Sequence, residues 1–141
     1  MKLKLLVFIL FVGSTIALKA QYADMYIMKG NAKDEIGDLA GAIADYTAAI
    51  EDDSTYAMAY FNRGWVKRKL NDYEGAIEDY TSALKFKPGY QIAFHNRGIC
   101  YMLMGKKDEA CTDWEKAWAL GYPDAKKLLD GFCYGNEWVP K

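Results

Sequence analysis

The sequence of 141 residues is poor in the residues that most catalytic and metal sites need. Its single histidine, His95, would have to serve any histidine-based metal site or any Ser–His or Cys–His pair. The chain contains no Gly-rich phosphate loop and no Cys-x-x-Cys motif. A formal net charge of −1 lacks the basic surplus typical of nucleic-acid binding. We therefore expect no catalytic residue, no cofactor, no metal and no nucleic-acid partner.

The sequence also lacks a hydrophobic run of the length that spans a bilayer. Leu5–Leu18 is uncharged over fourteen residues, whereas a membrane-spanning helix needs about 20. Two lysines precede this run and the small Ala20 follows it, which is the layout of a secretory signal peptide. We expect residues 1–20 to be removed near Ala20–Gln21, and the mature chain to be periplasmic or secreted without inserting in a membrane. Because Leu18 is bulky for a cleavage site, an uncleaved N-terminal anchor is the alternative.

What the chain does have is a period of 34 residues. Three contiguous units of this length fill residues 23–56, 57–90 and 91–124. Such a period indicates a repeat architecture. The recurring residues are Gly30, Gly64 and Gly98; Ala42, Ala76 and Ala110; Ala49, Ala83 and Ala117; Tyr46, Tyr80 and Trp114; and Asp45, Asp79 and Asp113. The recurring aspartates indicate a repeated structural or surface role.

Each unit is predicted to be a pair of antiparallel helices. In the second unit, Tyr60 and Gly64 follow a helical step that breaks at Asn71. A second helix ends before Pro88, because proline lacks the N–H and clashes with the preceding turn. Small residues such as Gly64 and Ala76 would let the two helices approach closely where they cross.

The pattern resembles the tetratricopeptide repeat family over residues 21–134. The family's order of aromatic, Gly, Ala, aromatic, Ala and Pro is present as Tyr60, Gly64, Ala76, Tyr80, Ala83 and Pro88. The resemblance implies an all-α, right-handed α-solenoid of three helix–turn–helix units plus a capping helix. Together with the signal peptide, it points to an exported bacterial member. Lys33 and Lys67 depart from the family, since they replace the usual tyrosine of the first helix.

The resemblance also carries expectations for the C-terminal residues. Residues 125–133 look like the first helix of a fourth unit and would cap the stack, while 135–141 form a tail. If this helix stands in for a next repeat, Cys133 lies almost opposite Cys111. We hypothesise a Cys111–Cys133 disulfide, which an oxidising compartment would preserve. The alternative is that these two cysteines and Cys100 are small buried hydrophobes.

In this family the first helices line a concave groove that binds protein or peptide segments. Phe61 and Trp65 are one helical turn apart, and exposed aromatics of this kind mark binding hot spots. The alternative is that they pack within the stack or against the tail. Asparagines could hold a peptide backbone, and His95 could hydrogen-bond a ligand. The partner-binding residues implied by the resemblance are Ile27, Asn31, Phe61, Asn62, Trp65, Arg68, Lys69, His95, Asn96 and Ile99.

One subset of the family clamps the C-terminal carboxylate of chaperone peptides with two lysines, an arginine and two asparagines. Asn31 and Asn62 fit that scheme. The cationic positions hold Ile27, Ile92 and Asn96 instead. Without these charges a terminal carboxylate would be poorly compensated, so we do not expect this clamp.

The leading hypothesis is a non-enzymatic interaction module or scaffold of the cell envelope that binds a protein or peptide in the groove. The second hypothesis is a structural subunit that assembles into a larger complex, or with its own copies, through convex or end surfaces. A third, an enzyme or thiol redox protein, would require an exposed cysteine of low pKa.

Overall fold

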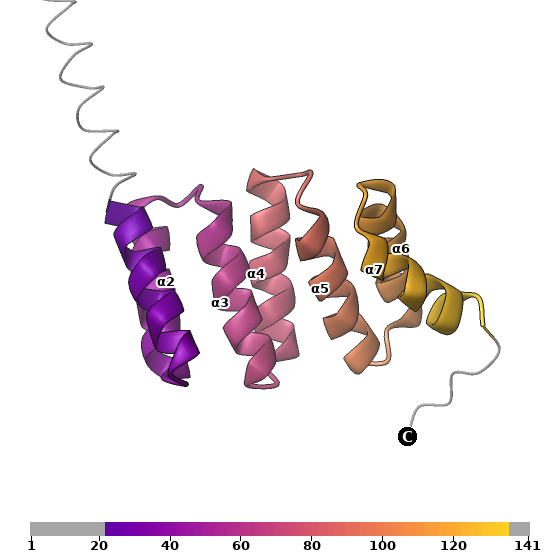
Figure 1. Ribbon diagram of the computed structural model, residues 1–141, viewed down its shortest axis with the longest axis horizontal. Coiled ribbons are helices and arrows are strands. Elements are labelled where there is room, and N and C mark those ends of the chain that lie inside the picture. Colours follow the sequence, from indigo (N-terminus) through magenta and orange to yellow (C-terminus); the bar gives the residue numbers. More distant parts are fainter. Residues whose placement is uncertain (1–21, 136–141) are drawn as a thin grey trace, which may run out of the picture. The chain divides into compact units, whose positions relative to one another are not determined.

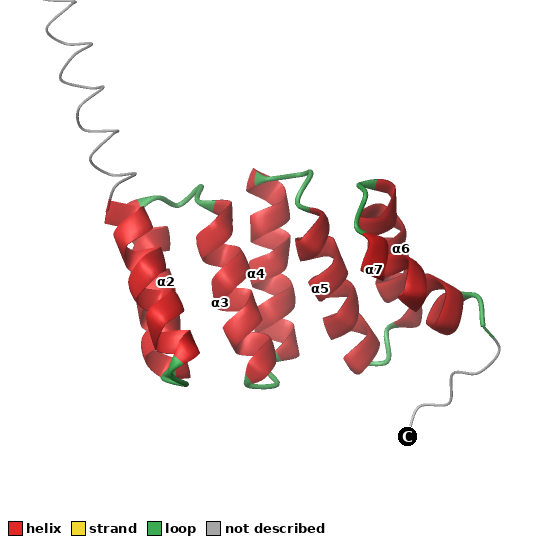
Figure 2. Cartoon of the chain, in the orientation of Figure 1, coloured by secondary structure: helices red, strands yellow, loops and turns green. Residues whose placement is uncertain are grey.

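The computed structural model describes residues 22–135 of the chain. Within this range the chain consists of helices joined by short turns and contains no strand (Figures 1 and 2). The prediction of an all-α fold is confirmed. The predicted signal peptide, its cleavage site and Trp138 of the tail lie outside the described residues. The chain divides into two compact units, one ending at Tyr56 and one beginning at Ala57, and each is described by itself.

The first unit is one pair of helices. Residues 22–35 are helical, and α2 spans Leu39–Asp52. The side chain of Asp38 accepts a hydrogen bond from the backbone N–H of Gly41 at 2.9 Å and so caps the start of α2. Tyr46 of α2 is buried, and its hydroxyl donates to the side-chain oxygen of Asn31 at 2.8 Å. The two helices are therefore joined by both packing and a polar contact.

The described residues of the second unit form five α-helices, each of which packs against the next in chain order (Figure 1). They are α3 (Ala57–Lys69), α4 (Tyr73–Phe86), α5 (Gln91–Leu103), α6 (Lys107–Ala119) and α7 (Pro123–Leu128). As the period predicts, α5 begins 34 residues after α3, and α6 begins 34 residues after α4. The chain breaks between α3 and α4 at Asn71, whose φ of 62° is left-handed.

Close approach of paired helices explains two of the recurring glycines. A Cβ atom on Gly64 would lie 3.2 Å from the carbonyl oxygen of Ala76. A Cβ atom on Gly98 would lie only 2.6 Å from Nε1 of Trp114, whose side chain is fully buried. Neither position can take a larger residue without moving its neighbour helix, which is why the sequence keeps glycine there.

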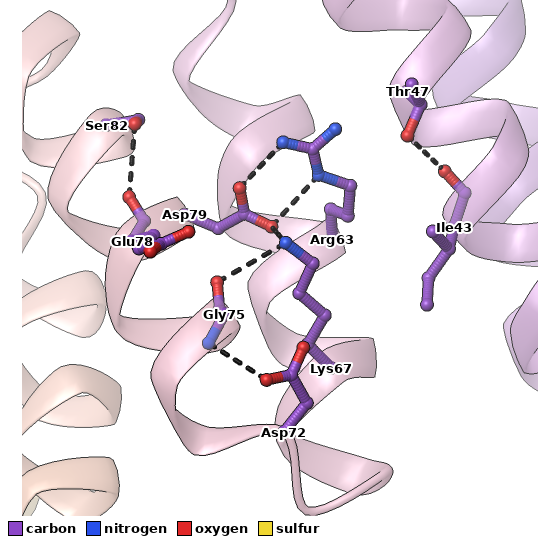
Figure 3. Close-up of polar contacts among 9 residues, drawn as sticks. All are labelled: Ile43, Thr47, Arg63, Lys67, Asp72, Gly75, Glu78, Asp79 and Ser82. Carbon is purple, nitrogen blue, oxygen red and sulfur yellow. Dashed lines mark hydrogen bonds and ion pairs between the residues drawn. The ribbon is translucent and has the colours of Figure 1, made fainter.

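Two of the recurring aspartates, Asp79 and Asp113, form buried ion pairs between the two helices of a pair. Asp79 is 3% exposed and lies opposite α3 (Figure 3). Its two carboxylate oxygens accept from Nε and Nη2 of Arg63 at 2.9 and 2.7 Å, and Lys67 Nζ lies 2.9 Å from Oδ2. Lys67 thus occupies the family's tyrosine position with a structural role. The same holds in the first unit, where Lys33 Nζ lies 2.7 Å from Asp45.

The next pair of helices repeats this arrangement. Nε and Nη2 of Arg97 donate to the carboxylate of Asp113 at 2.7 and 2.8 Å. Asp113 is 2% exposed. Nη1 of Arg97 also donates to Thr81 of α4 at 2.8 Å, so this arginine links two successive pairs. Bidentate pairing of this kind fixes both the position and the orientation of the guanidinium.

The C-terminal helix begins at Pro123, two residues before the predicted start at 125. Proline suits the first turn, where its missing N–H would have had no partner in any case. The helix continues as a wider π turn over Leu129–Cys133. Leu129 and Phe132 are buried in a cluster with Trp114, whose ring meets that of Phe132 edge-on at 5.4 Å between centroids.

Cys111 of α6 and Cys133 are joined by a disulfide with 5.8 Å between their Cα atoms. This separation lies within the ordinary range for a disulfide. The bond ties the end of the π turn to α6, beside the cluster that contains Phe132. Cys100 is a free thiol and is buried.

Candidate functional site

The exposed side of α3 carries an aromatic ring and a cation in contact. Trp65 is 37% exposed, which is high for a tryptophan. The guanidinium carbon of Arg68, one turn later, lies 4.5 Å from the centroid of its ring. This is the geometry of a cation–π contact. The exposed indole of Trp65 and the positive charge of Arg68 therefore lie side by side on α3.

Phe61, the other aromatic of the predicted pair, is half-buried. Its ring lies 4.9 Å from that of Tyr90 and 5.6 Å from that of Tyr80, between centroids. Phe61 thus packs within the stack, which was the alternative to an exposed contact.

His95 of α5 lies near Arg68 and beside the C-terminal helix. Its ring lies 4.7 Å from that of Tyr122, between centroids. Burial lowers the pKa of His95, the nearby Asp124 carboxylate opposes that shift, and the Arg68 guanidinium reinforces it. The imidazole is accordingly held toward its neutral form. We call Trp65, Arg68, His95 and Tyr122 the Arg68 cluster.

Three polar atoms in and beside the Arg68 cluster are buried without a hydrogen-bond partner among the described residues. They are Nε of Arg68, Nδ1 of His95 and the hydroxyl of Tyr80. The guanidinium of Arg68 acts on Tyr80 both through its charge and through side-chain hydrogen bonding, and both effects oppose the rise in pKa that burial causes. The three atoms are enclosed, so the part of the cluster that meets solvent is the ring of Trp65.

Two residues predicted to line the groove are buried instead, and those predictions are wrong. Asn96 is 3% exposed, and its side-chain nitrogen donates to the carbonyl of Ile92 at 2.8 Å. The side-chain amide nitrogen of Asn96 thus bonds to the backbone of its own helix and is not available to hold a peptide. Ile27 is 5% exposed in the first unit, as expected for an apolar side chain that can leave water.

The remaining predicted residues are distributed between the two units. Asn31 is exposed in the first unit and accepts from Tyr46. Asn62 is half-buried and Lys69 is exposed, both on α3. Ile99 packs against the C-terminal cluster around Trp114. Of the predicted residues, Trp65 and Arg68 are in contact, and the charge of Arg68 acts on His95.

Sequence reasoning missed Tyr122, whose ring contacts His95 from the residue before α7, and Asp124, whose charge acts on His95. The 34-residue period locates the helix but not the direction of side chains in the turn before it. One signal was present for Arg68. Its counterparts at a 34-residue step are Asp34 and Met102, so this arginine is not part of the repeated scaffold.

Cys100 is the free thiol among the described residues. Burial raises the pKa of the Cys100 thiol to about 11, the opposite of what a reactive cysteine requires. In residues 22–135 no group of His, Cys, Asp and Glu side chains is arranged to hold a metal ion. Over the same range no helix is both long and apolar enough to cross a membrane.

Comparison with known protein families and solved structures supports the predicted repeat architecture. Sequence profiles of the tetratricopeptide repeat match residues 23–54, 57–90 and 93–125. No curated protein sequence matches the chain. Several solved structures are similar to it.

One is the second TPR of Spaghetti (RPAP3) bound to the HSP90 peptide SRMEEVD, with 33% identity and a TM-score of 0.69 over 71% of this chain and 93% of that one. Another is the second TPR domain of the human RPAP3 protein in complex with the HSP70 peptide SGPTIEEVD, with 30% identity and a TM-score of 0.77 over 82% and 98%. The crystal structure of MamA shares 31% identity and a TM-score of 0.70, and covers 74% of this chain. The chain spans only 61% of MamA.

Proposed function

Because the chain belongs to the tetratricopeptide repeat family, we propose that it is a non-enzymatic scaffold that binds a protein or peptide segment on the face of the Arg68 cluster. The observation that carries this proposal is the exposed indole of Trp65 in contact with the guanidinium of Arg68. Tryptophan and arginine are among the side chains most enriched at the energetic centres of interfaces.

Peptides are the ligand class that the similar structures support. The two RPAP3 domains are described as bound to an HSP90 and an HSP70 peptide. These peptides are ligands of the RPAP3 domains. For this chain, the cationic positions of the carboxylate clamp hold Ile27, Ile92 and Asn96. We therefore propose a peptide partner that is recognised through other residues.

A place in the cell envelope or outside the cell is the second part of the proposal. Two independent features support it: the signal-peptide pattern of residues 1–20 and the Cys111–Cys133 pair, since disulfides persist in oxidising compartments. We also propose that α7 and its π turn act as a cap, which the burial of Leu129 and Phe132 supports. Cell fractionation with N-terminal sequencing tests the location: a mature chain starting at Gln21 is expected, and an intact chain in the cytoplasm would contradict it.

Replacement of Trp65 by alanine tests the binding face, and the chain offers a matched control. Trp118 of α6 is 46% exposed, against 37% for Trp65. Both variants should keep the helical circular dichroism of the wild type. In pull-downs from an envelope extract, Trp65→Ala should lose partners that the wild type and Trp118→Ala retain.

The alternative function, a structural subunit that assembles through another surface, is favoured by one observation. Trp118 and Leu120 are 46% and 44% exposed at the end of α6. If this surface is the working one, Trp118→Ala should abolish partner capture or self-association in sedimentation, and Trp65→Ala should not. That outcome would replace the proposed function by the alternative.

A further inference from the structure

Trp118 lies on a part of α6 that is open to solvent. It is 46% exposed, whereas Leu84, its counterpart one 34-residue step earlier on α4, is 7% exposed. A complete pair of helices, α5 and α6, follows α4. Among the described residues, α6 is followed only by the six-residue α7 and its π turn. The same position is therefore covered inside the stack and uncovered at its C-terminal end.

The last described residues of the chain lie against the face of α6 that carries Trp118. Cys133 is bonded to Cys111, and the hydroxyl of Tyr134 donates to Oε1 of Glu115 at 2.9 Å. Cys111, Glu115 and Trp118 follow one another at steps of four and three residues, so they share one face of the helix. Tyr134 is itself 64% exposed. The chain thus leaves the π turn beside an open aromatic surface.

The exit of the chain from the π turn is a tight turn at Gly135. A Cβ atom on this residue would lie 2.6 Å from the carbonyl oxygen of Gly131 and 3.1 Å from that of Asp130. Glycine alone has no Cβ, and so it alone permits this close approach of backbone to backbone. The residues that follow Gly135 therefore start close against the π turn.

Trp138 is within reach of Trp118. The Cα atoms of Cys111 and Cys133 are 5.8 Å apart, and Trp118 lies two turns beyond Cys111, about 10 Å along α6 at 1.5 Å per residue. Trp138 follows Cys133 by five residues, which span up to about 17 Å when extended. The separation is therefore shorter than the available length of chain.

The composition of the segment after Gly135 suits an apolar contact made by an extended chain. Pro140 cannot continue a helix and biases Val139 toward an extended backbone. Contact between two indoles removes apolar surface of both from water, and aromatic pairs gain further stabilisation from offset or edge-on packing. The segment consists of Asn136, Glu137, Trp138, Val139, Pro140 and Lys141.

We infer that residues 136–141 fold back over α6 of the same chain, with the indole of Trp138 packed on that of Trp118. The segment then takes the place of the second helix that a fourth pair would supply. The inference does not depend on the Arg68 cluster. It has a functional consequence, because the surface that a structural subunit would use at the end of α6 is occupied by the chain itself, which leaves the face of Trp65 for partners.

Acrylamide quenching of tryptophan fluorescence tests this inference through the sign of the change. In the oxidised chain, Trp138→Ser should uncover Trp118, so the quenchable fraction should rise and the emission shift to the red although one tryptophan is lost. A segment that does not contact α6 gives the opposite result, because its own exposed tryptophan disappears and the quenchable fraction falls. Far-UV circular dichroism should remain that of the wild type.

Variants of the partner residue assign the effect to this contact. Trp118→Ala should uncover Trp138 and also raise the quenchable fraction. When Trp118→Ala is already present, Trp138→Ser should lower it, because each change removes one side of the same contact. A rise in that background would mean that Trp138 covers another tryptophan and would overturn the inference.

The glycine turn supplies a variant that keeps both indoles and a matched control. Gly135→Ala should raise the quenchable fraction, since its Cβ meets the carbonyl of Gly131. Gly131→Ala should leave it unchanged, because a Cβ there meets no atom within 4 Å. Equal quenching of the two variants would contradict the role of the turn.

Sedimentation separates contact within one chain from contact between chains. The wild type and Trp138→Ser should both sediment as monomers, with quenching independent of protein concentration. A wild-type dimer that Trp138→Ser dissociates would mean that the segment binds a second copy, and the inference would be overturned. None of these results bears on Trp65, so the proposed binding face stands or falls by its own test.

Discussion

The second unit contains the same side chain, arginine, in two opposite electrostatic settings. Arg63 and Arg97 lie between paired helices, where each neutralises a buried aspartate. Arg68 lies on the other side of α3, against Trp65, with no carboxylate among the described residues paired to it. The first two are enclosed and satisfied, and the third is incompletely satisfied and next to an exposed ring. The difference separates residues that hold the stack together from residues that are free to recognise a partner.

The largest effect should come from breaking an enclosed pair. Asp79→Asn leaves Arg63 and Lys67 without their counter-charge in a buried position. We expect the free energy of unfolding to fall by about 3 kcal/mol, measured by urea denaturation at neutral pH. Asp130→Asn is the control, because Asp130 pairs with Lys126 in solvent, and its effect should be too small to resolve. Equal effects of the two variants would remove the basis for treating the enclosed pairs as structural.

A comparable effect should follow from opening the disulfide that holds the C-terminal helix beside His95. Cys111 and Cys133 are 22 residues apart in sequence. In the chain-entropy model, closing a loop of this size stabilises the folded state relative to the unfolded chain by about 3 kcal/mol. Thermal unfolding of the wild type should shift downward on reduction. The double variant Cys111→Ser, Cys133→Ser should unfold at the reduced wild-type temperature and not respond to reductant. A reductant effect that persists in the double variant would mean that the bond is not its cause.

Arg68→Gln should have a smaller effect on stability than Asp79→Asn and a larger one on binding. No ion pair is lost, so we expect the free energy of unfolding to change by less than about 1 kcal/mol in either direction. Urea denaturation of both variants side by side measures the contrast. If Arg68→Gln destabilises the fold as much as Asp79→Asn does, Arg68 belongs to the scaffold.

The smallest effect concerns pH. The folded chain holds the pKa of His95 below its ordinary value of 6.5, because of burial first and Arg68 in addition. At mildly acidic pH the unfolded chain therefore binds a proton that the folded chain does not, and stability decreases as the pH falls through that range. His95→Gln should reduce this decrease between about pH 7 and pH 5, as seen by denaturation at each pH. Identical pH profiles for the two proteins would contradict the burial argument.

Most of the fold could be predicted from the sequence because a solenoid depends on a few steric requirements that recur. Gly64 and Ala76 must be small where two helices touch, and Asn71 and Pro88 mark where helices end. Each requirement is local, so a single sequence reveals it by repetition at a fixed interval. The last helix begins at Pro123, two residues before the start that the 34-residue period predicts, because proline fits the first turn of a helix.

The binding face was harder to predict, since position within a repeat does not determine exposure. Asn96 occupies a groove position of the family, yet its amide satisfies the carbonyl of Ile92 within the same helix. The ring of Phe61 packs against the rings of Tyr80 and Tyr90. The ring of Tyr122 contacts His95, and the charge of Asp124 acts on it, from the end of the third unit, where the residue types do not recur. Contacts that depend on the rotamer of one side chain, or on a turn that occurs once, leave no periodic signal.

The enclosed ion pairs have a consequence for how such a chain can grow or be engineered. Arg63 and Asp79 both fall within 57–90, and Arg97 and Asp113 both fall within 91–124. Each 34-residue block therefore carries both members of its enclosed ion pair, and copying the block leaves neither member unmatched. Even the bond from Arg97 reaches back to Thr81, a residue that a duplicated 57–90 block would supply again. Insertion of a second copy of that block should lengthen the array without any compensating substitution, which makes tandem duplication a low-cost route to a larger surface.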